Sequence, residues 1–148
     1  MIIERDKRYF KRYRLRLKAR AKFAPSLPLT GKPGDDTILR ALIKALGSKS
    51  AISIQPNGDA VELIKTSLSA KDSVLTLLFH RSSPTAADPA YRKKSKDGLK
   101  LRLPKKERDE EQAVSAHLIL STVAGDPDSY DAVLEEIPGL SLSTISQV

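Results

Sequence analysis

Alternating apolar and basic residues fill the N-terminal part of the chain. From Tyr9 to Phe23, seven of the eight odd positions are apolar or aromatic, and six of the seven even positions are Lys or Arg. This period of two is typical of a half-buried strand. A basic amphipathic helix is the alternative, since Ala, Leu, Arg and Lys favour helices. On a helix, however, Tyr13, Leu15 and Leu17 would scatter around the cylinder, so the pattern favours a strand.

The next segments predict one helix and three strands. After a Pro- and Gly-rich loop at 25–34, apolar residues repeat with helical spacing over 36–46, with Asp35 or Asp36 as the N-cap and Gly47 as the stop. Two groups of turn residues, at 56–58 and 70–72, then separate three runs that favour strands. These runs span 50–55, 60–68 and 73–80.

Residues 81–112 are the most polar part of the chain and predict a long basic loop. The stretch holds three prolines and many charged residues, so it is either disordered or a mobile loop with a functional role. Within it, only Leu99, Leu101 and Leu103 alternate with basic residues as a short strand would. The run 114–123 is rich in β-branched and aliphatic residues and favours another strand.

The last segment, 126–148, predicts an acidic helical tail. Asp128 can cap a helix whose apolar face holds four residues at helical spacing: Tyr130, Val133, Leu134 and Ile137. Pro138 and Gly139 end this helix, and a second helix of about two turns follows from Ser141 or Ser143. Because that second helix is unusually short, it leaves open that the chain is part of a longer protein.

Together these elements predict a single α+β domain over residues 1–148. Its sheet is mostly antiparallel with about five strands, one helix packs on the sheet, and a helical pair ends the chain. Apolar residues make up 40% of the 148, which suffices for one modest core. No apolar run approaches the ~18 residues of a membrane span, and no signal peptide follows the basic start. The absence of Cys excludes disulfides, Cys-zinc sites and thiol catalysis, and fits a cytoplasmic protein.

Charge is distributed unevenly along the chain, whose net charge is +8. Residues 1–23 carry +8 and residues 81–108 carry +7, whereas residues 109–148 hold eight acids and no Lys or Arg. Two basic segments and an acidic tail in one small chain permit two outcomes. Either the basic segments attract a polyanion, or the acidic end folds against a basic one.

Six basic residues of the N-terminal strand form the first candidate site. On a strand they share one face at spacings of about 6.7 Å, and they repel one another because no acid lies between them. A polyanion or an acidic protein surface would relieve this repulsion, and arginine suits phosphate recognition. The alternative is a solvated edge strand whose charges prevent edge-to-edge pairing. The six residues are Arg12, Arg14, Arg16, Lys18, Arg20 and Lys22.

A second basic cluster lies in the predicted loop, where it could become ordered on a phosphate backbone. Its alternative is a solvated polar loop. Tyr91 is the one aromatic residue nearby, and Tyr9 and Tyr13 are expected in the core, so the predicted binding is mainly electrostatic. The cluster comprises Arg92, Lys93, Lys94, Lys96, Lys100 and Arg102, followed by Lys105, Lys106 and Arg108.

Residues 137–146 resemble two DNA-binding motifs. The run Ile137-Pro138-Gly139-Leu140 resembles a helix-hairpin-helix, and residues 139–146 resemble the turn of a helix-turn-helix. The first motif lacks its second glycine at Ser141, and the second has Glu135 where a small residue normally packs. The neighbouring acids would also repel DNA. We therefore expect an ordinary corner that packs or pairs with another chain.

The chain contains only two histidines, His80 and His117. If their strands are neighbours, the two could act as an acid–base pair for metal-independent RNA cleavage. A histidine at a strand end is more often structural, so no catalytic residue is predicted. The acidic run 109–111 is more typical of a solvated surface than of a metal site, and neither a metal nor another cofactor is predicted.

The charge pattern predicts a non-enzymatic protein that binds RNA or DNA by its phosphate backbone, with weak sequence specificity. One alternative is an interaction or inhibitor module that docks its basic face on an acidic partner protein, and a ribonuclease that uses the two histidines comes third. The opposite charges of the two ends also predict a homodimer formed through the 128–148 helices.

Overall fold

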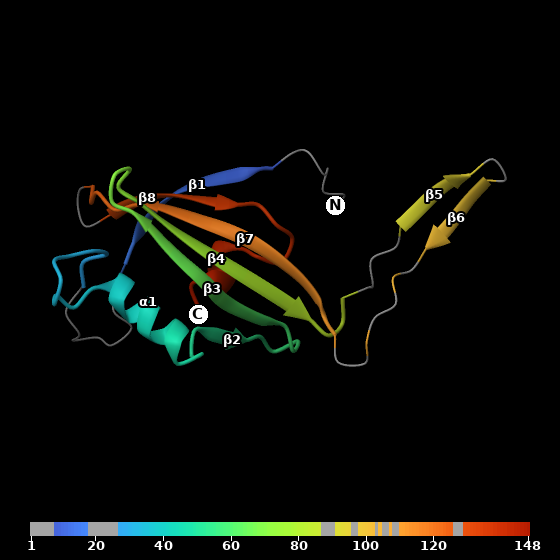
Figure 1. The fold of residues 1–148 in the computed structure, drawn as a ribbon, viewed down its shortest axis with the longest axis horizontal. Coiled ribbons are helices and arrows are strands. Elements are labelled where there is room, and N and C mark those ends of the chain that lie inside the picture. The colour runs from blue at the N-terminus through green and yellow to red at the C-terminus, as the bar shows by residue number, and fades with distance from the viewer. Residues whose placement is uncertain are drawn as a thin grey trace.

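A computed structural model describes residues 8–17, 27–86, 91–95, 98–102, 104, 107, 110–125 and 129–148. In this part of the chain, six strands form one antiparallel sheet with the spatial order β1-β8-β7-β4-β3-β2 (Figure 1). These strands are β1 (Phe10–Arg16), β2 (Ile52–Ile54), β3 (Ala60–Ser69), β4 (Val74–Ser83), β7 (Gln112–Ser121) and β8 (Ser129–Glu135). Two further strands, β5 (Tyr91–Ser95) and β6 (Gly98–Arg102), pair with each other, and the helices are α1 (Ile38–Gly47) and α2 (Leu142–Ile145). The expected mostly antiparallel sheet is confirmed, with more strands and less helix than predicted.

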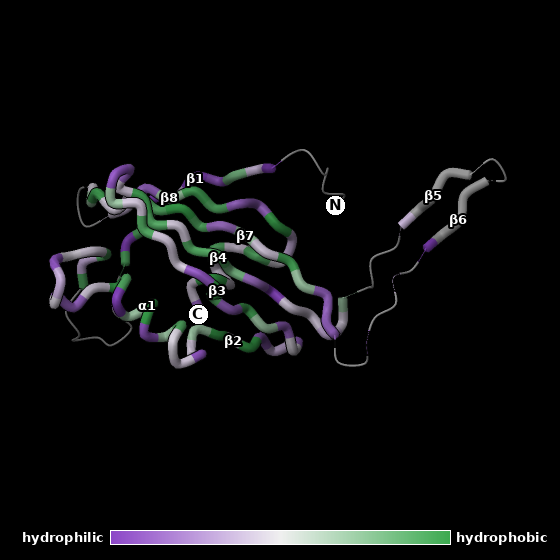
Figure 2. Tube along the Cα trace, viewed as in Figure 1, coloured by the Kyte–Doolittle hydropathy of each residue, from purple (hydrophilic) through white to green (hydrophobic). Residues whose placement is uncertain are grey.

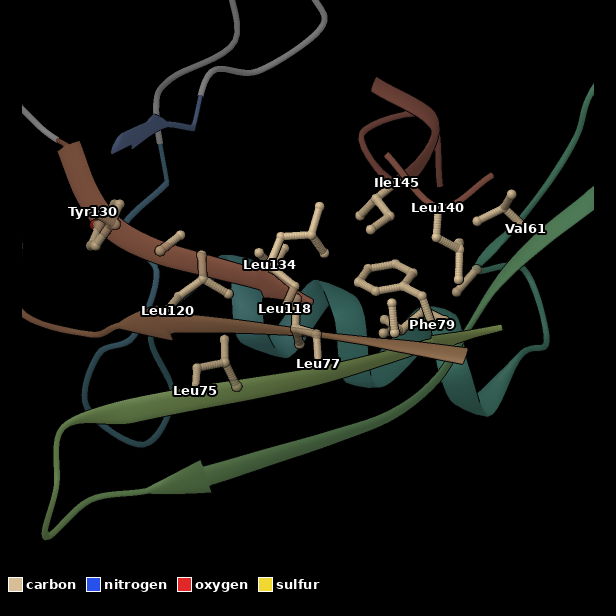
Figure 3. Close-up of a cluster of buried hydrophobic side chains, with 14 of the residues drawn as sticks. Val61, Leu75, Leu77, Phe79, Leu118, Leu120, Tyr130, Leu134, Leu140 and Ile145 are labelled. Atoms are coloured by element: carbon tan, nitrogen blue, oxygen red, sulfur yellow. The ribbon is translucent and has the colours of Figure 1, made fainter. Parts of the chain in front are cut away.

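One face of the sheet carries the hydrophobic core. In β4, Leu75, Leu77 and Phe79 are buried, whereas the residues between them are half-buried, so alternate side chains point to opposite faces. Alternate residues of β3, β7 and β8 complete the same layer (Figure 3). In Figure 2, the hydrophobic stretches accordingly concentrate in the sheet and along α1.

The helix α1 lies on the core side of the sheet, where Ile38 and Leu42 pack against the core. Its N-cap is Thr37, whose side chain accepts a hydrogen bond from the Arg40 backbone N–H at 3.2 Å. The predicted cap at Asp35 or Asp36 was therefore wrong, because the Asp35 carboxylate instead accepts from the Lys32 backbone N–H in the preceding turn. No helix in the described ranges is long and apolar enough to span a bilayer.

The predicted pattern of strands and turns is confirmed from β1 to β4. Tyr13, Leu15 and Leu17 pack against the core, as the alternation over the first strand predicted. The rest of that predicted strand, from residue 18 to 23, lies outside the described residues. The strands β2, β3 and β4 occupy the three predicted runs and are joined by the two predicted turns.

The predicted C-terminal helical pair is wrong. Residues 129–135 form the strand β8, and the chain then makes a turn and a four-residue helix, α2. Tyr130, Ala132 and Leu134 are all buried and follow the period of two that is typical of a strand. Tyr130, Leu134 and Ile137 also have helical spacing, which is why the sequence predicted a helix here. Strand pairing decided between the two patterns, because β8 is hydrogen-bonded to β1 on one side and to β7 on the other.

The predicted loop over 81–112 was only partly correct. Its first residues belong to β4 and its last to β7, and β5 and β6 form an antiparallel hairpin between them. The alternating leucines at 99 and 101 mark β6, the one strand that the sequence indicated here. Figure 1 shows the β5–β6 hairpin beyond the end of the six-stranded sheet, away from the other labelled strands and from α1.

Candidate nucleic-acid interface

The candidate site is the face of the sheet opposite the core, called the open face below. Because Tyr13, Leu15 and Leu17 pack against the core, the alternate residues of β1 belong to the open face. Both described helices pack on the core side, so neither of them covers the open face. Among the described residues, the exposed charged side chains of β1 on this face are not covered by either helix.

Three arginines of the predicted basic series lie on the open face of β1 and form what we call the arginine ladder: Arg12, Arg14 and Arg16. All three are exposed, and the side chains of Arg12 and Arg14 retain 76% and 71% of their accessible surface. The strand β1 is at the edge of the sheet, where it pairs with β8 alone. Lys18, Arg20 and Lys22 of the predicted site lie outside the described residues.

One carboxylate forms ion pairs with two arginines of the ladder. Asp131 of β8 lies opposite Arg14 in the register, and its oxygens are 3.2 Å from Arg12 Nη2 and 3.8 Å from Arg14 Nε. Arg16 makes no ion pair within the part of the chain that the structure describes. Exposed ion pairs contribute about 0–1 kcal/mol. Three positive charges beside one negative charge leave the ladder electropositive.

The acidic C-terminal segment folds against the N-terminal strand of the same chain. Besides the contacts of Asp131, Lys11 Nζ lies 2.6 Å from Glu136 Oε1, and Arg8 Nη1 lies 2.8 Å from Glu135 Oε1. The hydrogen bond from Lys11 to Glu136 raises the pKa of that ammonium above its ordinary value. The charge pattern permitted the acidic end to fold against a basic segment of the same chain. These three acids do so, because β8 pairs antiparallel with β1.

Glu135 is 4% exposed and links Arg8 to His117. Its Oε2 accepts a hydrogen bond from the His117 backbone N–H at 3.2 Å and lies 2.9 Å from His117 Nδ1. Burial raises the pKa of Glu135, but the hydrogen bonds from His117 and the charge of Arg8 outweigh it and hold that pKa below its ordinary value. No sequence pattern predicts this role, because it requires β8 to be a strand beside β7.

The two histidines lie on adjacent strands and on the same, open face. His117 is opposite Leu78 and His80 is opposite Ser115, which makes the histidines diagonal neighbours. Such positions are separated by about 7–8 Å in antiparallel sheets. The condition for an acid–base pair, neighbouring strands, is therefore met. Within the described ranges, no group of three or more His, Cys, Asp and Glu residues could hold a metal ion.

An exposed aromatic residue accompanies the ladder. Phe10 is 48% exposed and occupies the one even position of the first strand pattern that is not basic. Tyr13 packs against the core as predicted. Tyr9, just before the first residue of β1, is 56% exposed, so its predicted place in the core is wrong. An exposed ring beside cationic groups can stack on a nucleic-acid base.

The second predicted basic cluster lies on the projecting hairpin. The backbone of Arg92, Lys93 and Lys94 is in β5 and that of Lys100 and Arg102 is in β6, whereas Lys96 is outside the described residues. The register places Lys93 opposite Lys100, and Arg102 is exposed. The structure does not bring this cluster to the arginine ladder, since the hairpin extends away from the sheet (Figure 1).

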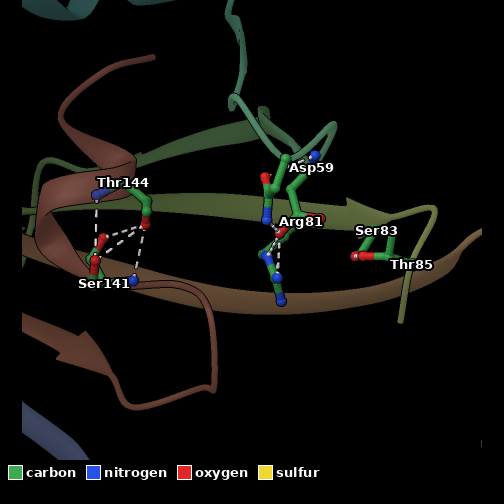
Figure 4. A network of polar contacts seen from close by, with 7 residues as sticks. Asp59, Arg81, Ser83, Thr85, Ser141 and Thr144 are labelled. Carbon is green, nitrogen blue, oxygen red and sulfur yellow. Dashed lines mark hydrogen bonds and ion pairs between the residues drawn. The ribbon is translucent and has the colours of Figure 1, made fainter. Parts of the chain in front are cut away.

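The segment that resembles DNA-binding motifs is a packed turn. Gly139 has φ +81°, and the Arg81 guanidinium occupies the space that a Cβ at this glycine would need. Arg81 also donates two hydrogen bonds to Asp59, which is 2% exposed (Figure 4). The Ser83 hydroxyl, with Arg81 and Asn57, holds the pKa of Asp59 below its ordinary value against the effect of burial. Both DNA-binding motifs need a helix before the turn, where the structure has β8.

Comparisons with protein-family models, with curated proteins and with solved structures found no match to this chain.

Proposed function

We propose that this protein binds RNA or DNA by its phosphate backbone, with the arginine ladder as the primary contact. The observation that carries the proposal is that Arg12, Arg14 and Arg16 are exposed on an edge strand. Among the described residues, Asp131 of β8 pairs with Arg12 and Arg14, and no carboxylate pairs with Arg16. Ladder positions are about 6.7 Å apart, twice the 3.4 Å rise per nucleotide along one strand of a duplex. The three guanidinium groups can therefore contact every second phosphate of one strand.

Two further features support nucleic acid as the partner. Phe10 offers an exposed ring next to the ladder, and stacking on such rings tolerates any base sequence. The β5–β6 hairpin is a two-stranded ribbon, a shape that the major groove of duplex DNA admits. Its sequence is basic, with Arg92, Lys93 and Lys94 in β5 and with Lys100 and Arg102 in β6.

The salt dependence of binding tests the proposal. Fluorescence anisotropy is measured on duplex DNA, single-stranded DNA and RNA over a series of salt concentrations. Each phosphate contact adds about −0.9 to the slope of log K against log salt on duplex DNA, and about −0.7 on a single strand. Replacing the three ladder arginines with Ala should therefore make the slope shallower by about 2–3 and weaken binding to all sequences alike.

A matched control removes three exposed lysines outside the sheet: Lys32, Lys44 and Lys71. This variant loses the same formal charge but should retain most of the wild-type slope. Equal losses in the two variants would contradict a role for the ladder itself. No retention of any nucleic acid at low salt would contradict the proposal and favour an interaction module that docks on an acidic partner protein.

The pairing of His117 with a buried carboxylate favours a second candidate, metal-independent RNA cleavage. Glu135 Oε2 lies 2.9 Å from His117 Nδ1 and orients the ring, as the carboxylate does in catalytic triads, so the other ring nitrogen of His117 would donate a proton to the departing 5′-oxygen. His80 would accept the proton of the 2′-hydroxyl as that oxygen attacks the adjacent phosphorus. The bond from phosphorus to the 5′-oxygen breaks, which leaves a 2′,3′-cyclic phosphate and a 5′-hydroxyl.

A labelled RNA and a DNA of the same sequence, incubated with a chelator, test the second candidate. Cleavage of the RNA alone, lost in His80→Ala and in His117→Ala while binding remains, would support it. Intact RNA in the presence of bound wild-type protein would rule cleavage out and leave the binding proposal standing.

A further inference from the structure

A large apolar cavity lies between the core face of the sheet and the two helices. Its volume is about 540 Å³, and its lining comes from β1, α1, β3, β4, β7 and α2. The side chains that define it include Leu15, Ile38, Leu77, Phe79, Leu118 and Ile145. Protein interiors contain few voids larger than a water molecule, and ligand pockets range over about 300–1,000 Å³. The cavity thus has the size of a binding site for a small molecule.

The position of α1 explains why the space exists. The apolar residues Ile38 and Leu42 face the core, but no residue of α1 is fully buried. Ile38 and Leu42 line the cavity, so the apolar side of α1 forms one of its walls. Leu15, Leu17 and Leu42 are only partly buried, which makes the cavity reachable where β1 ends and α1 lies.

The chemistry of the lining selects the occupant. Almost all lining residues are apolar, so the backbone N–H and C=O groups of an extended peptide would find few partners there, at a cost of several kcal/mol per group. An alkyl chain carries no such groups. The one charged lining residue is Arg16, which makes no ion pair among the described residues and can meet an anion at the end of the chain.

We propose that this cavity binds a single-chain aliphatic carboxylate, with its alkyl chain among the leucines and its carboxylate at Arg16. Arg16 lines this cavity and also belongs to the arginine ladder, whereas the apolar lining residues lie on the core side of the sheet. Variants of those apolar residues therefore test this site without altering the proposed nucleic-acid contact. A hydrocarbon chain gains about 0.8 kcal/mol for each CH₂ group removed from water, which gives a ligand of this kind sufficient driving force.

Titration calorimetry with dodecanoate and with the neutral dodecanol tests the proposal on the full-length chain. Wild-type protein should bind both saturably at one site, with a negative heat-capacity change from apolar burial. Arg16→Gln should weaken dodecanoate about tenfold, equivalent to 1.4 kcal/mol, and leave dodecanol unchanged. Arg12→Gln is the matched control, because it removes an arginine from the same strand without touching the cavity, and it should bind both ligands like wild type.

Two variants that fill the cavity, Leu77→Phe and Leu118→Phe, should weaken both ligands at least tenfold while the protein stays folded by circular dichroism. Absence of saturable dodecanoate binding to wild-type protein would overturn the proposal. So would equal loss in Arg16→Gln and Arg12→Gln, or undiminished binding in folded Leu77→Phe and Leu118→Phe, since both results indicate adsorption on the basic surface.

Discussion

At the scale of single residues, Glu135 makes stability depend on pH. The folded-state pKa of this carboxyl is below its ordinary value, which in the unfolded chain is about 4.3. Its contribution to stability is therefore complete above that unfolded-state value and is lost as the pH falls through the folded-state pKa. Glu135→Gln should lower the free energy of unfolding by about 1–3 kcal/mol at pH 7, because hydrogen bonds to a charged, buried group are lost. Urea unfolding followed by circular dichroism measures this.

The same variant should also flatten the decline of stability as the pH falls below the unfolded-state value of about 4.3, because it lacks the carboxylate that the wild type must protonate there. Glu62→Gln is the control, since Glu62 lies on the open face and makes no ion pair among the described residues. A Glu135→Gln variant whose pH profile parallels the wild type would contradict the assigned role of this carboxylate.

Gly139 is the second single residue whose replacement should change stability, because its position requires a glycine. Its φ is +81°, and a methyl group there would collide with the Arg81 guanidinium, which in turn is held by Asp59. Gly139→Ala should therefore cost about 1–3 kcal/mol from backbone strain and steric displacement. At Gly47, which ends α1, an added methyl meets nothing, so Gly47→Ala should be neutral within about 1 kcal/mol. Thermal unfolding of the two variants separates these outcomes, and equal stabilities would contradict the packing assigned to Gly139.

At the scale of elements, the β5–β6 hairpin is separable from the sheet. Ser83 at the end of β4 and Gln112 at the start of β7 are paired directly, so a short loop can join them. Replacing residues 87–108 with a brief Gly-Ser linker should change the free energy of unfolding by less than about 1 kcal/mol, since loop length has a small entropic effect. Urea unfolding checks this, and loss of the folded state would show that the hairpin contributes to the core.

The same replacement should weaken nucleic-acid binding and make its salt dependence shallower, because the hairpin carries much of the second basic cluster. Anisotropy on the three nucleic acids measures the change. Unaltered affinity would restrict the proposed interface to the arginine ladder.

At the scale of the whole molecule, the homodimer stays a prediction whose expected interface has changed. Residues 129–135 are an interior strand paired on both sides, and Ile145 of α2 is buried in the core of its own chain. The helical pair expected at that interface is therefore absent, and the edge of β1 that no described strand pairs with is another surface that a dimer could use. Light scattering at low salt checks the oligomeric state, with a dimer at twice the chain mass of 16.3 kDa. A mass of 16.3 kDa at high protein concentration would show that the dimer is wrong.

Local patterns predicted those elements whose residues suit only one structure. The alternation around Tyr13 and Leu15 favours a strand over a helix, the apolar repeat over α1 fits a helix, and turn residues such as Asn57 and Gly58 separate β2 from β3. The arginine ladder follows from the same alternation, because a strand that buries its odd positions must expose its even ones. These features depend on the spacing of residue types within a short stretch of the chain, so they can be predicted from the sequence alone.

Only the tertiary structure decided what β8 is and what its acids do. Tyr130, Ala132 and Leu134 fit a period of two, and Tyr130, Leu134 and Ile137 fit a helix, so the pattern alone does not choose. Pairing with β1 and β7 satisfies the backbone of β8 on both sides, and this makes it a strand. The contact of Arg12 with Asp131 and that of His117 with Glu135 follow from the same pairing. Contacts between strands depend on the register of distant segments, and only the folded chain fixes that register.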